Sequence, residues 1–401
     1  MDSGLQQARR SGSQSSVPNR LCRFCVFDKI TLSIMALRLY NTLTRQVDEL
    51  KPIRGNTIRM YTCGPTVYHY AHIGNLRTFL FQDILRRYIR YKGFDLVQVM
   101  NITDVEDKII ARAREEGLSI GEYSQKYEKA FLKDLDTLRI QRPEIMPRAT
   151  EHIDVMIDLV SKLKEGGLTY ERDGSTYYRI DRFRDYGKLS QLDPSDLRPS
   201  GQVDEDEYSK EDPRDFVLWK ARKEGEAEWE SPFGPGRPGW HLECSAMSMK
   251  YLGESFDIHC GGVDLVFPHH ENEIAQSEGA TGKPFVQHWV HAAHLIVEGQ
   301  KMSKSLGNFF TLRDLLDKGF SSLALRYLLA SVHYRRQLNF TSDGVEQSRA
   351  SIRRVNDFVL RVREVGDGVP TNAEVSERVA EARSRFEAAM DEDLNTSAGL
   401  A

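Results

Sequence analysis

The stretch from Tyr61 to Asn75 constrains the fold of this 401-residue chain more than any other. An apolar segment, Ile58 to Tyr61, indicates a strand before it, and the pattern from Asn75 onward is helical. A loop punctuated by glycine and proline joins the two. A strand, a loop and a helix N-terminus can hold a phosphate chain, because the first N–H groups of a helix have no partner within it. The loop also contains a cysteine and two histidines, which are suitable metal ligands.

The elements that follow predict a parallel α/β core. Apolar residues recur at helical spacing from Leu76 to Tyr91, Gly93 is suited to end that helix, and Leu96 to Met100 indicates a second strand. A strand, a helix and a strand in quick succession form a βαβ unit with a right-handed crossover. Further strands are expected at Phe256–His259 and Leu295–Val297.

The remaining patterns are mixed. Ser119 to Glu122 has the form of a capping box before a helix that reaches about Leu138, and Glu151–Glu165 is also helical. Asp173-Gly174 indicates a hairpin, and the polar, acidic stretch Gln191–Asp215 indicates a connection. Helices are expected from Trp240 to Leu252 and from about His269, and everything beyond Leu312 is helical in pattern.

The amino-acid composition argues against several classes of protein. Against 59 acidic residues stand 55 basic ones, so nucleic-acid binding would have to use local patches. No apolar run approaches the roughly 20 residues that span a bilayer, and we expect no membrane association. Five scattered cysteines, an odd number, favour a reducing compartment over a disulfide framework.

Four residues are candidate metal ligands. His269 and Glu273 are four positions apart, so on a helix they face the same way, and Cys63 and Cys244 come from two distant segments. Two thiolates, an imidazole and a carboxylate suit tetrahedral zinc. Taken singly, each of the four is more often a buried thiol, a core histidine or a surface acid.

A second feature is the cationic loop Lys301-Met302-Ser303-Lys304-Ser305. Two lysines three positions apart among small hydroxyl residues suit a triphosphate. Such a pair is usually only a solvated loop.

Together these motifs resemble the signatures of class I aminoacyl-tRNA synthetases. His72-Ile73-Gly74-Asn75 is similar to the HIGH motif, and Lys301 to Ser305 spells KMSKS. Cys63 precedes HIGH, and segments beginning at Gly239 and Phe267 match Gly-Trp-His-x-Glu-Cys and Phe-Pro-His-His-Glu-Asn-Glu. These three features narrow the resemblance to cysteinyl-tRNA synthetases, and it extends from about Leu37 to Ala401.

The resemblance implies an enzyme that activates L-cysteine with ATP and Mg²⁺ and transfers it to tRNA(Cys), as a monomer in the cytoplasm. It implies one zinc ion that binds the substrate thiolate and thereby selects cysteine. Lys301 and Lys304 would stabilise the charge on the pyrophosphate, with His72 on the other side. The implied sites are zinc at Cys63, Cys244, His269 and Glu273; ATP at His72, Asn75, Gly262, Asp264 and Lys304; and the amino acid at Cys63, Thr66, Thr103 and Trp240.

Some of these roles have plain alternatives. Trp240 suits a core aromatic as well as a wall over the amino acid, and Thr66 and Thr103 suit ordinary loop hydroxyls. Cys260 is expected to be a small structural thiol. The ligase of mycothiol synthesis, which joins cysteine to a glucosaminyl-inositol, shares the zinc and KMSKS machinery, and an inactive binding paralogue is a third possibility.

We therefore expect a Rossmann-like α/β catalytic domain with a mixed insertion and a helical C-terminal region. If the chain ends at Ala401, where the family continues, we expect cysteine activation to persist and tRNA charging to weaken.

The chain is expected to divide into five parts. They are an N-terminal extension (1–36) that is disordered or results from a start codon assigned too early, the first half of the catalytic domain (37–140), the insertion (141–238), the second half with the KMSKS loop (239–311), and a helical stem-contact region that leads into a truncated anticodon-binding domain (312–401).

Overall fold

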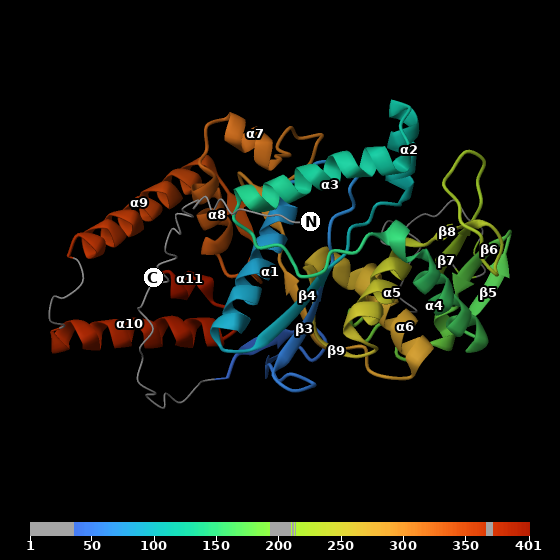
Figure 1. Ribbon diagram of the computed structural model, residues 1–401, viewed down its shortest axis with the longest axis horizontal. Helices are drawn as coiled ribbons and strands as arrows, with labels where there is room; N and C mark the ends of the chain where they lie inside the picture. Colours follow the sequence, from blue (N-terminus) through green and yellow to red (C-terminus); the bar gives the residue numbers. More distant parts are fainter. Residues whose placement is uncertain (1–35, 193–209, 211, 213, 366–371) are drawn as a thin grey trace, which may run out of the picture. The chain divides into compact units, whose positions relative to one another are not determined.

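The computed structural model describes residues 36–192, 210, 212, 214–365 and 372–401. The expected N-terminal extension and most of the expected connection Gln191–Asp215 lie outside these residues. Within them, the strands form four small sheets, and helices lie on both sides of strands β3, β4 and β9 (Figure 1).

The parallel core is the sheet β10-β9-β3-β4, in which every neighbouring pair is parallel. Its strands are β3 (Thr57–Thr62), β4 (Asp95–Met100), β9 (Phe256–Gly262) and β10 (Val286–Ala292). The prediction of a βαβ unit is confirmed, because helix α1 (Ile73–Tyr91) connects β3 to its parallel neighbour β4. The helix begins at Ile73, two residues before the predicted start at Asn75, because the His72 side chain caps it.

The alternation of side chains along a strand explains how the core sheet is covered. Met60 on β3 packs in the same apolar cluster as Phe81 and Leu85 of α1. Its neighbour Tyr61 points to the opposite face and packs with Leu242 of helix α5 (Trp240–Leu252). Two faces buried by helices are typical of a parallel sheet.

A second sheet with the order β5-β6-β7-β8 is antiparallel and lies within the segment 141–238. The predicted hairpin at Asp173-Gly174 is present between β5 and β6. In Figure 1, α5 and α6 lie between this sheet and the core sheet. The elements here are α4 (Ile153–Glu165), β5 (Thr169–Arg172), β6 (Ser175–Tyr178), β7 (Phe216–Ala221), β8 (Gly236–Pro238) and α6 (Glu271–Thr281).

The C-terminal part is mostly helical, but the expectation of helix throughout beyond Leu312 is wrong at one place. Strand β13 (Leu338–Phe340) pairs in parallel with β11 (Leu295–Val297), and β12 (Gln300–Lys301) flanks β11 on the other side. Leu338 and Phe340 are both buried, so a long-range partner decides their conformation. The helices of this part are α7 (Leu312–Asp317), α8 (Ser322–Ser331), α9 (Ser342–Val365), α10 (Ala373–Asp391) and α11 (Thr396–Gly399).

The remaining elements are local. Strands β1 (Arg38–Asn41) and β2 (Gln46–Glu49) form a hairpin, and β1 lies beside β10. Helix α2 (Asp107–Glu116) precedes α3 (Ile120–Thr137), which begins at the predicted capping box of Ser119 and Glu122. Among the described residues, no helix combines the length and the apolarity that a bilayer crossing requires.

Candidate active site

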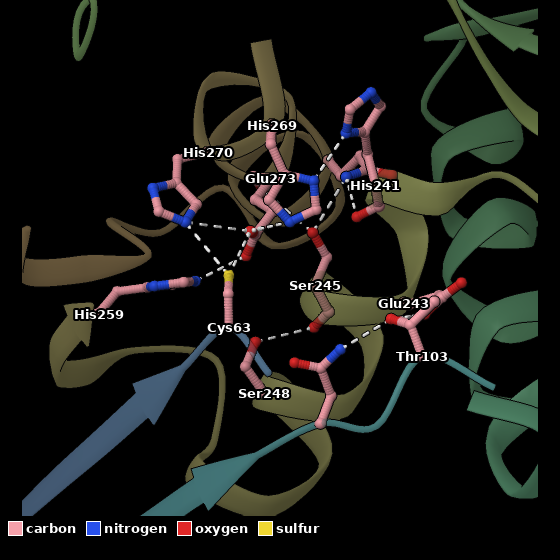
Figure 2. Close-up of polar contacts among 12 residues, drawn as sticks. Cys63, Thr103, His241, Glu243, Ser245, Ser248, His259, His269, His270 and Glu273 are labelled. Atoms are coloured by element: carbon pink, nitrogen blue, oxygen red, sulfur yellow. Dashed lines mark hydrogen bonds and ion pairs between the residues drawn. The ribbon is translucent and has the colours of Figure 1, made fainter. Parts of the chain in front are cut away.

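A buried cluster of thiol, imidazole and carboxylate groups lies where β3 ends. Cys63 directly follows that strand, and its backbone N–H bonds to the carbonyl of Cys260 on β9 at 3.2 Å. One ligand atom each from Cys63, His269, His270 and Glu273 falls within a group whose atoms are all within 4.8 Å of one another. Figure 2 shows Cys63, His270 and Glu273 converging on this point.

The short contacts define the centre of the cluster. The Cys63 Sγ lies 3.2 Å from His270 Nε2 and 3.9 Å from Glu273 Oε1. His269 Nε2 lies 3.1 Å from the same carboxylate oxygen, which confirms that His269 and Glu273 face the same way. The sequence prediction did not include His270, although its spacing of three from Glu273 on a helix was a usable signal.

Cys244 reaches the cluster from α5, and its thiol interacts with Cys63 and His269. The hydrogen bond from Cys63 is the main reason that the pKa of Cys244 falls to about 6. Burial raises the pKa of Cys63, so the proton of this pair stays on Cys63. Three of the predicted ligands, Cys63, His269 and Glu273, thus lie together with His270, and Cys244 adjoins them through Cys63 and His269.

The charges of the neighbouring groups follow from this pairing. Burial opposes the charging of His269, but the Cys244 thiolate and the Glu273 carboxylate outweigh it and raise the pKa of His269 to about 10. Burial likewise opposes the ionisation of Glu273, but His259 and His269 outweigh it and lower the pKa of Glu273 to about 2. Without a metal, a proton on His269 therefore balances the anionic groups.

Two further histidines, His259 and His241, orient the ligands of the cluster. His259 Nε2 lies 2.8 Å from Glu273 Oε2, which leaves Oε1 facing the thiols. His241 Nδ1 lies 2.9 Å from His269 Nδ1, so the other nitrogen of His269 faces inward. Partners of this kind are what fix the ligands of a metal site. The buried thiols, imidazoles and carboxylate therefore form a group compatible with a bound metal ion.

Two glycines, Gly64 and Gly261, allow backbone segments near the cluster to approach their neighbours closely. A side chain on Gly64 would place its Cβ 1.7 Å from the carbonyl oxygen of Asn101. On Gly261, a Cβ would lie 2.6 Å from the His270 ring. Only glycine allows the loop after β3 to pass so near β4, and the end of β9 to pass so near the cluster.

A cavity of about 350 Å³ opens beside the cluster. It brings together most of the residues predicted from the motifs, which lie far apart in the sequence. The predicted residues that line it are Cys63, Thr66, His72, Asn75, Trp240, Gly262, Asp264 and Lys304.

The start of α1 fixes the tautomer of His72, and burial keeps its ring neutral. Its Nδ1 accepts the backbone N–H of Asn75 at 3.2 Å, and the Asn75 side chain accepts the backbone N–H of His72. A nitrogen that accepts carries no proton, so Nε2 is the donor of the neutral ring. Burial lowers the pKa of His72 to about 4, although Asp264 acts in the opposite direction. His72 is therefore a neutral donor at pH 7.

The lysine loop closes one side of this cavity. Lys304 Nζ lies 5.3 Å from the centre of the Phe309 ring, whose edge meets His72 at 5.2 Å between centroids. Asn308 braces the loop by accepting from the Ser303 N–H and donating to the Lys301 carbonyl. Lys301 itself is exposed on β12, outside the residues that line the cavity.

The two predicted threonines differ. Thr66 lines the cavity, whereas Thr103 is buried and donates to Glu243 Oε2 at 2.7 Å.

Trp240 lies in the cavity wall with its ring 4.4 Å from that of His269, so it covers the cluster. Cys260 is fully buried on β9, in line with a structural thiol.

Comparison with known proteins agrees with this arrangement. Residues 49–350 match the family model described as tRNA synthetases class I (C) catalytic domain. A Cysteine–tRNA ligase of Solibacter usitatus is 55% identical over 367 residues, which cover 92% of this chain and 79% of that protein. A Cysteine–tRNA ligase of Protochlamydia amoebophila is 54% identical, with 92% and 78% covered.

Solved structures share the fold. A Mycobacterium tuberculosis methionyl-tRNA synthetase in complex with methionyl-adenylate has a TM-score of 0.62 at 14% identity, with 86% of this chain and 81% of that chain covered. A putative arginyl-tRNA synthetase from Campylobacter jejuni has a TM-score of 0.55 at 15% identity, with 86% and 83% covered. The predicted Rossmann-like fold is thereby confirmed. This chain belongs to the cysteine–tRNA ligase family of class I tRNA synthetases.

Proposed function

We propose that this protein joins L-cysteine to tRNA(Cys) in two steps. In the first, a carboxylate oxygen of cysteine attacks the α-phosphorus of ATP, and the bond to the bridging oxygen breaks to release pyrophosphate. In the second, a hydroxyl of the terminal ribose of the tRNA attacks the cysteinyl carbonyl carbon and loses its proton, and AMP leaves. The main support is that one cavity is lined both by Cys63 of the thiol cluster and by His72 and Lys304.

The class I tRNA synthetase family implies tRNA and ATP as substrates. The identity of the amino acid rests on the buried cluster and on the names of the relatives. These relatives do not support the alternative of an aminosugar ligase.

The cluster suits zinc. Cys63, His269 and Glu273 would hold the ion together with Cys244, which contacts Cys63 and His269, or with His270, because thiolates and imidazoles are the ligands that zinc prefers. When bound, zinc would accept the substrate sulfur and favour it over a hydroxyl.

The discrimination between cysteine and serine that such an enzyme needs exceeds what the shape of a pocket provides. Serine and cysteine differ by one atom of similar size, and a pocket separates such pairs by only about 1–3 kcal/mol. Rejection by about 10⁴-fold requires about 5.5 kcal/mol. A site that bonds sulfur specifically would supply the difference, with Trp240 covering the amino acid.

The chain's own groups would handle the triphosphate through position and charge. The neutral His72 donates from Nε2 to a phosphate oxygen, and Lys304 neutralises the charge that develops on the leaving pyrophosphate. Mg²⁺ would enter with ATP. Asn75 keeps His72 in the donating tautomer, while Gly262 and Asp264 lie where the nucleoside would approach the backbone.

The remaining predicted residues have less direct roles. Thr66, which lines the cavity, would contact the amino acid. Thr103 would act through Glu243, to which it donates, and Lys301 would reach the phosphates only if the loop moves toward the cavity.

Labelled cysteine tests the proposal. With ATP and Mg²⁺, label should pass to total tRNA and not to glucosaminyl-inositol, and pyrophosphate exchange should depend on cysteine. Label on the aminosugar would replace this function by the ligase alternative. An absence of cysteine-dependent exchange would mean an inactive paralogue.

A further inference from the structure

Arg77, in the second turn of helix α1, is a buried cation to which the proposed function assigns no role. Its side chain is 2% exposed, and its guanidinium donates four hydrogen bonds, all to backbone carbonyls. Nη1 reaches the carbonyl of Ala293 at 2.8 Å and that of His294 at 3.0 Å. Nη2 reaches the carbonyl of His333 at 3.2 Å and that of Arg336 at 2.6 Å. One side chain thus ties α1 to two other segments of the chain.

The charge of Arg77 is stabilised by these carbonyls alone. Among the described residues, no carboxylate pairs with Arg77, and burial lowers the pKa of its guanidinium to about 10. The group is therefore still charged at pH 7. A buried charge is costly unless its hydrogen bonds are satisfied, and here four carbonyl dipoles satisfy them. Arginine suits this place because its donors form a rigid, planar fork, whereas all the donors of lysine belong to one nitrogen.

The first pair of carbonyls marks the point where the chain leaves the core sheet. Ala293 and His294 lie between β10, in the core sheet, and β11, in a different sheet. Strand β11 pairs with β12, which ends at Lys301, the first residue of the KMSKS loop. Arg77 therefore fixes the base from which this hairpin and its loop project.

The second pair of carbonyls belongs to the strand that pairs with β11. His333 and Arg336 lie between α8 and β13, and β13 runs parallel to β11. The two segments also contact each other directly, because the Ala293 N–H donates to the Tyr334 carbonyl at 2.8 Å. The guanidinium of Arg77 therefore holds the starts of both parallel strands, and with them the small sheet that carries the KMSKS loop.

Helix α1 also holds the other end of this segment. The Ile73 N–H donates to the Phe310 carbonyl at 3.0 Å. The stretch 293–310, which includes Lys304, is thus attached to α1 at both ends, at one by the guanidinium and at the other by the backbone. Because His72 caps the same helix, α1 carries one phosphate-binding group and anchors the loop that carries the other.

We propose that Arg77 is a positioning residue for activation of the amino acid. It holds the base of the KMSKS loop on α1, so that Lys304 and His72 face the triphosphate at a fixed separation. It acts on ATP and not on cysteine, because none of its four hydrogen bonds goes to an element that carries the thiol cluster. This inference rests on the proposed function, because it assumes the reaction with ATP.

The test compares Arg77→Lys with the wild-type full chain in cysteine-dependent pyrophosphate exchange. Lysine keeps the positive charge but cannot span the four carbonyls. We expect kcat/KM for ATP to fall about 10- to 100-fold, up to the cost of a misplacement of about 1 Å, while the KM for cysteine stays within about twofold. The matched control is Arg326→Lys, because Arg326 also donates to two backbone carbonyls, but at the end of α3. This control should keep the wild-type kcat/KM for ATP.

A double-mutant cycle with Lys304 separates positioning from general destabilisation. If Arg77 acts through the loop, Arg77→Lys should lower the exchange rate of the Lys304→Ala protein by less than about twofold, because the group that it positions is gone. A purely structural role would lower the exchange rate by the same factor with and without Lys304.

Urea unfolding of each variant checks that it folds. Arg77→Gln takes the place of Arg77→Lys if the lysine variant does not fold, because glutamine also removes the buried charge. Additive effects in the cycle, an equal rise in the KM for cysteine, or loss of the fold in both variants would overturn the inference. Exchange by the wild type with an additive cycle rejects only the role of Arg77, whereas no cysteine-dependent exchange by the wild type rejects the proposed function itself.

Discussion

His259 offers a sharp test of how the cluster is organised. Its Nε2 lies 2.8 Å from Glu273 Oε2, and both side chains have an exposed fraction of 0%. Its ring also stacks on Trp289, at 4.5 Å between centroids and 18° between planes. His259→Phe keeps an aromatic ring for this stacking and removes the hydrogen-bond donor to Glu273, together with the buried Nδ1, which has no hydrogen-bond partner among the described residues.

Two effects are expected, each with its own magnitude. Loss of an orienting partner typically lowers metal affinity by about 10- to 100-fold, which corresponds to about 1.4–2.7 kcal/mol. In the metal-free protein, the buried carboxylate oxygen loses its donor, at a cost of about 1–3 kcal/mol in the free energy of unfolding. That cost should be smaller at low pH, where a protonated Glu273 needs no donor.

The measurements are zinc competition against a chelator of known affinity and urea unfolding of the metal-free protein. The control is His288→Phe, which removes another buried histidine that lies outside the cluster of Cys63, His269, His270 and Glu273. Zinc affinity of His259→Phe within twofold of the wild type would show that Glu273 does not need His259 for its orientation. An equal loss in the control would point to general destabilisation.

Four further predictions follow from the site. His72→Ala should lose about 1 kcal/mol of stability with the helix cap, as well as cysteine-dependent exchange; His72→Asn should recover the stability in urea unfolding but not the exchange, and recovery of both would refute the donor role. Lys304→Ala should lower the rate of cysteine-dependent pyrophosphate exchange by about 10²- to 10³-fold. Lys301→Ala should lower this rate less, because Lys301 lies outside the cavity wall. A larger loss in Lys301→Ala than in Lys304→Ala would contradict this placement. Cys244→Ser should lose bound zinc and the preference for cysteine over serine together, as measured by metal analysis and exchange with each amino acid; a preference that survives metal loss would reject selection by zinc. Folding lowers the pKa of His72 to about 4 from 6.5, so between these pH values the unfolded form binds a proton and the folded form does not. The free energy of unfolding of the wild type should therefore fall as the pH drops through this window. His72→Asn should show a smaller slope of unfolding free energy against pH, and identical slopes would contradict the buried neutral ring.

Local chemistry made several elements predictable from the sequence. The capping box of Ser119 and Glu122 and the hairpin at Asp173-Gly174 are set by neighbouring residues, and both are present. Strand β10 was not predicted, because Gln287, His288 and His291 interrupt its apolar pattern. Long-range partners account for part of this strand: the Gln287 carbonyl accepts from Asn41, and His291 bonds to Thr42 and His270.

For the site, the sequence alone determined the kinds of group and the family, because motifs such as His72–Asn75 and Lys301–Ser305 are continuous stretches of chain. Only the tertiary structure decided which side chains meet. It placed His270 in the cluster beside His269, turned Thr103 toward Glu243 and left Lys301 in solvent. Buried polar groups must find partners, and those partners come from strands and helices that are distant in the sequence.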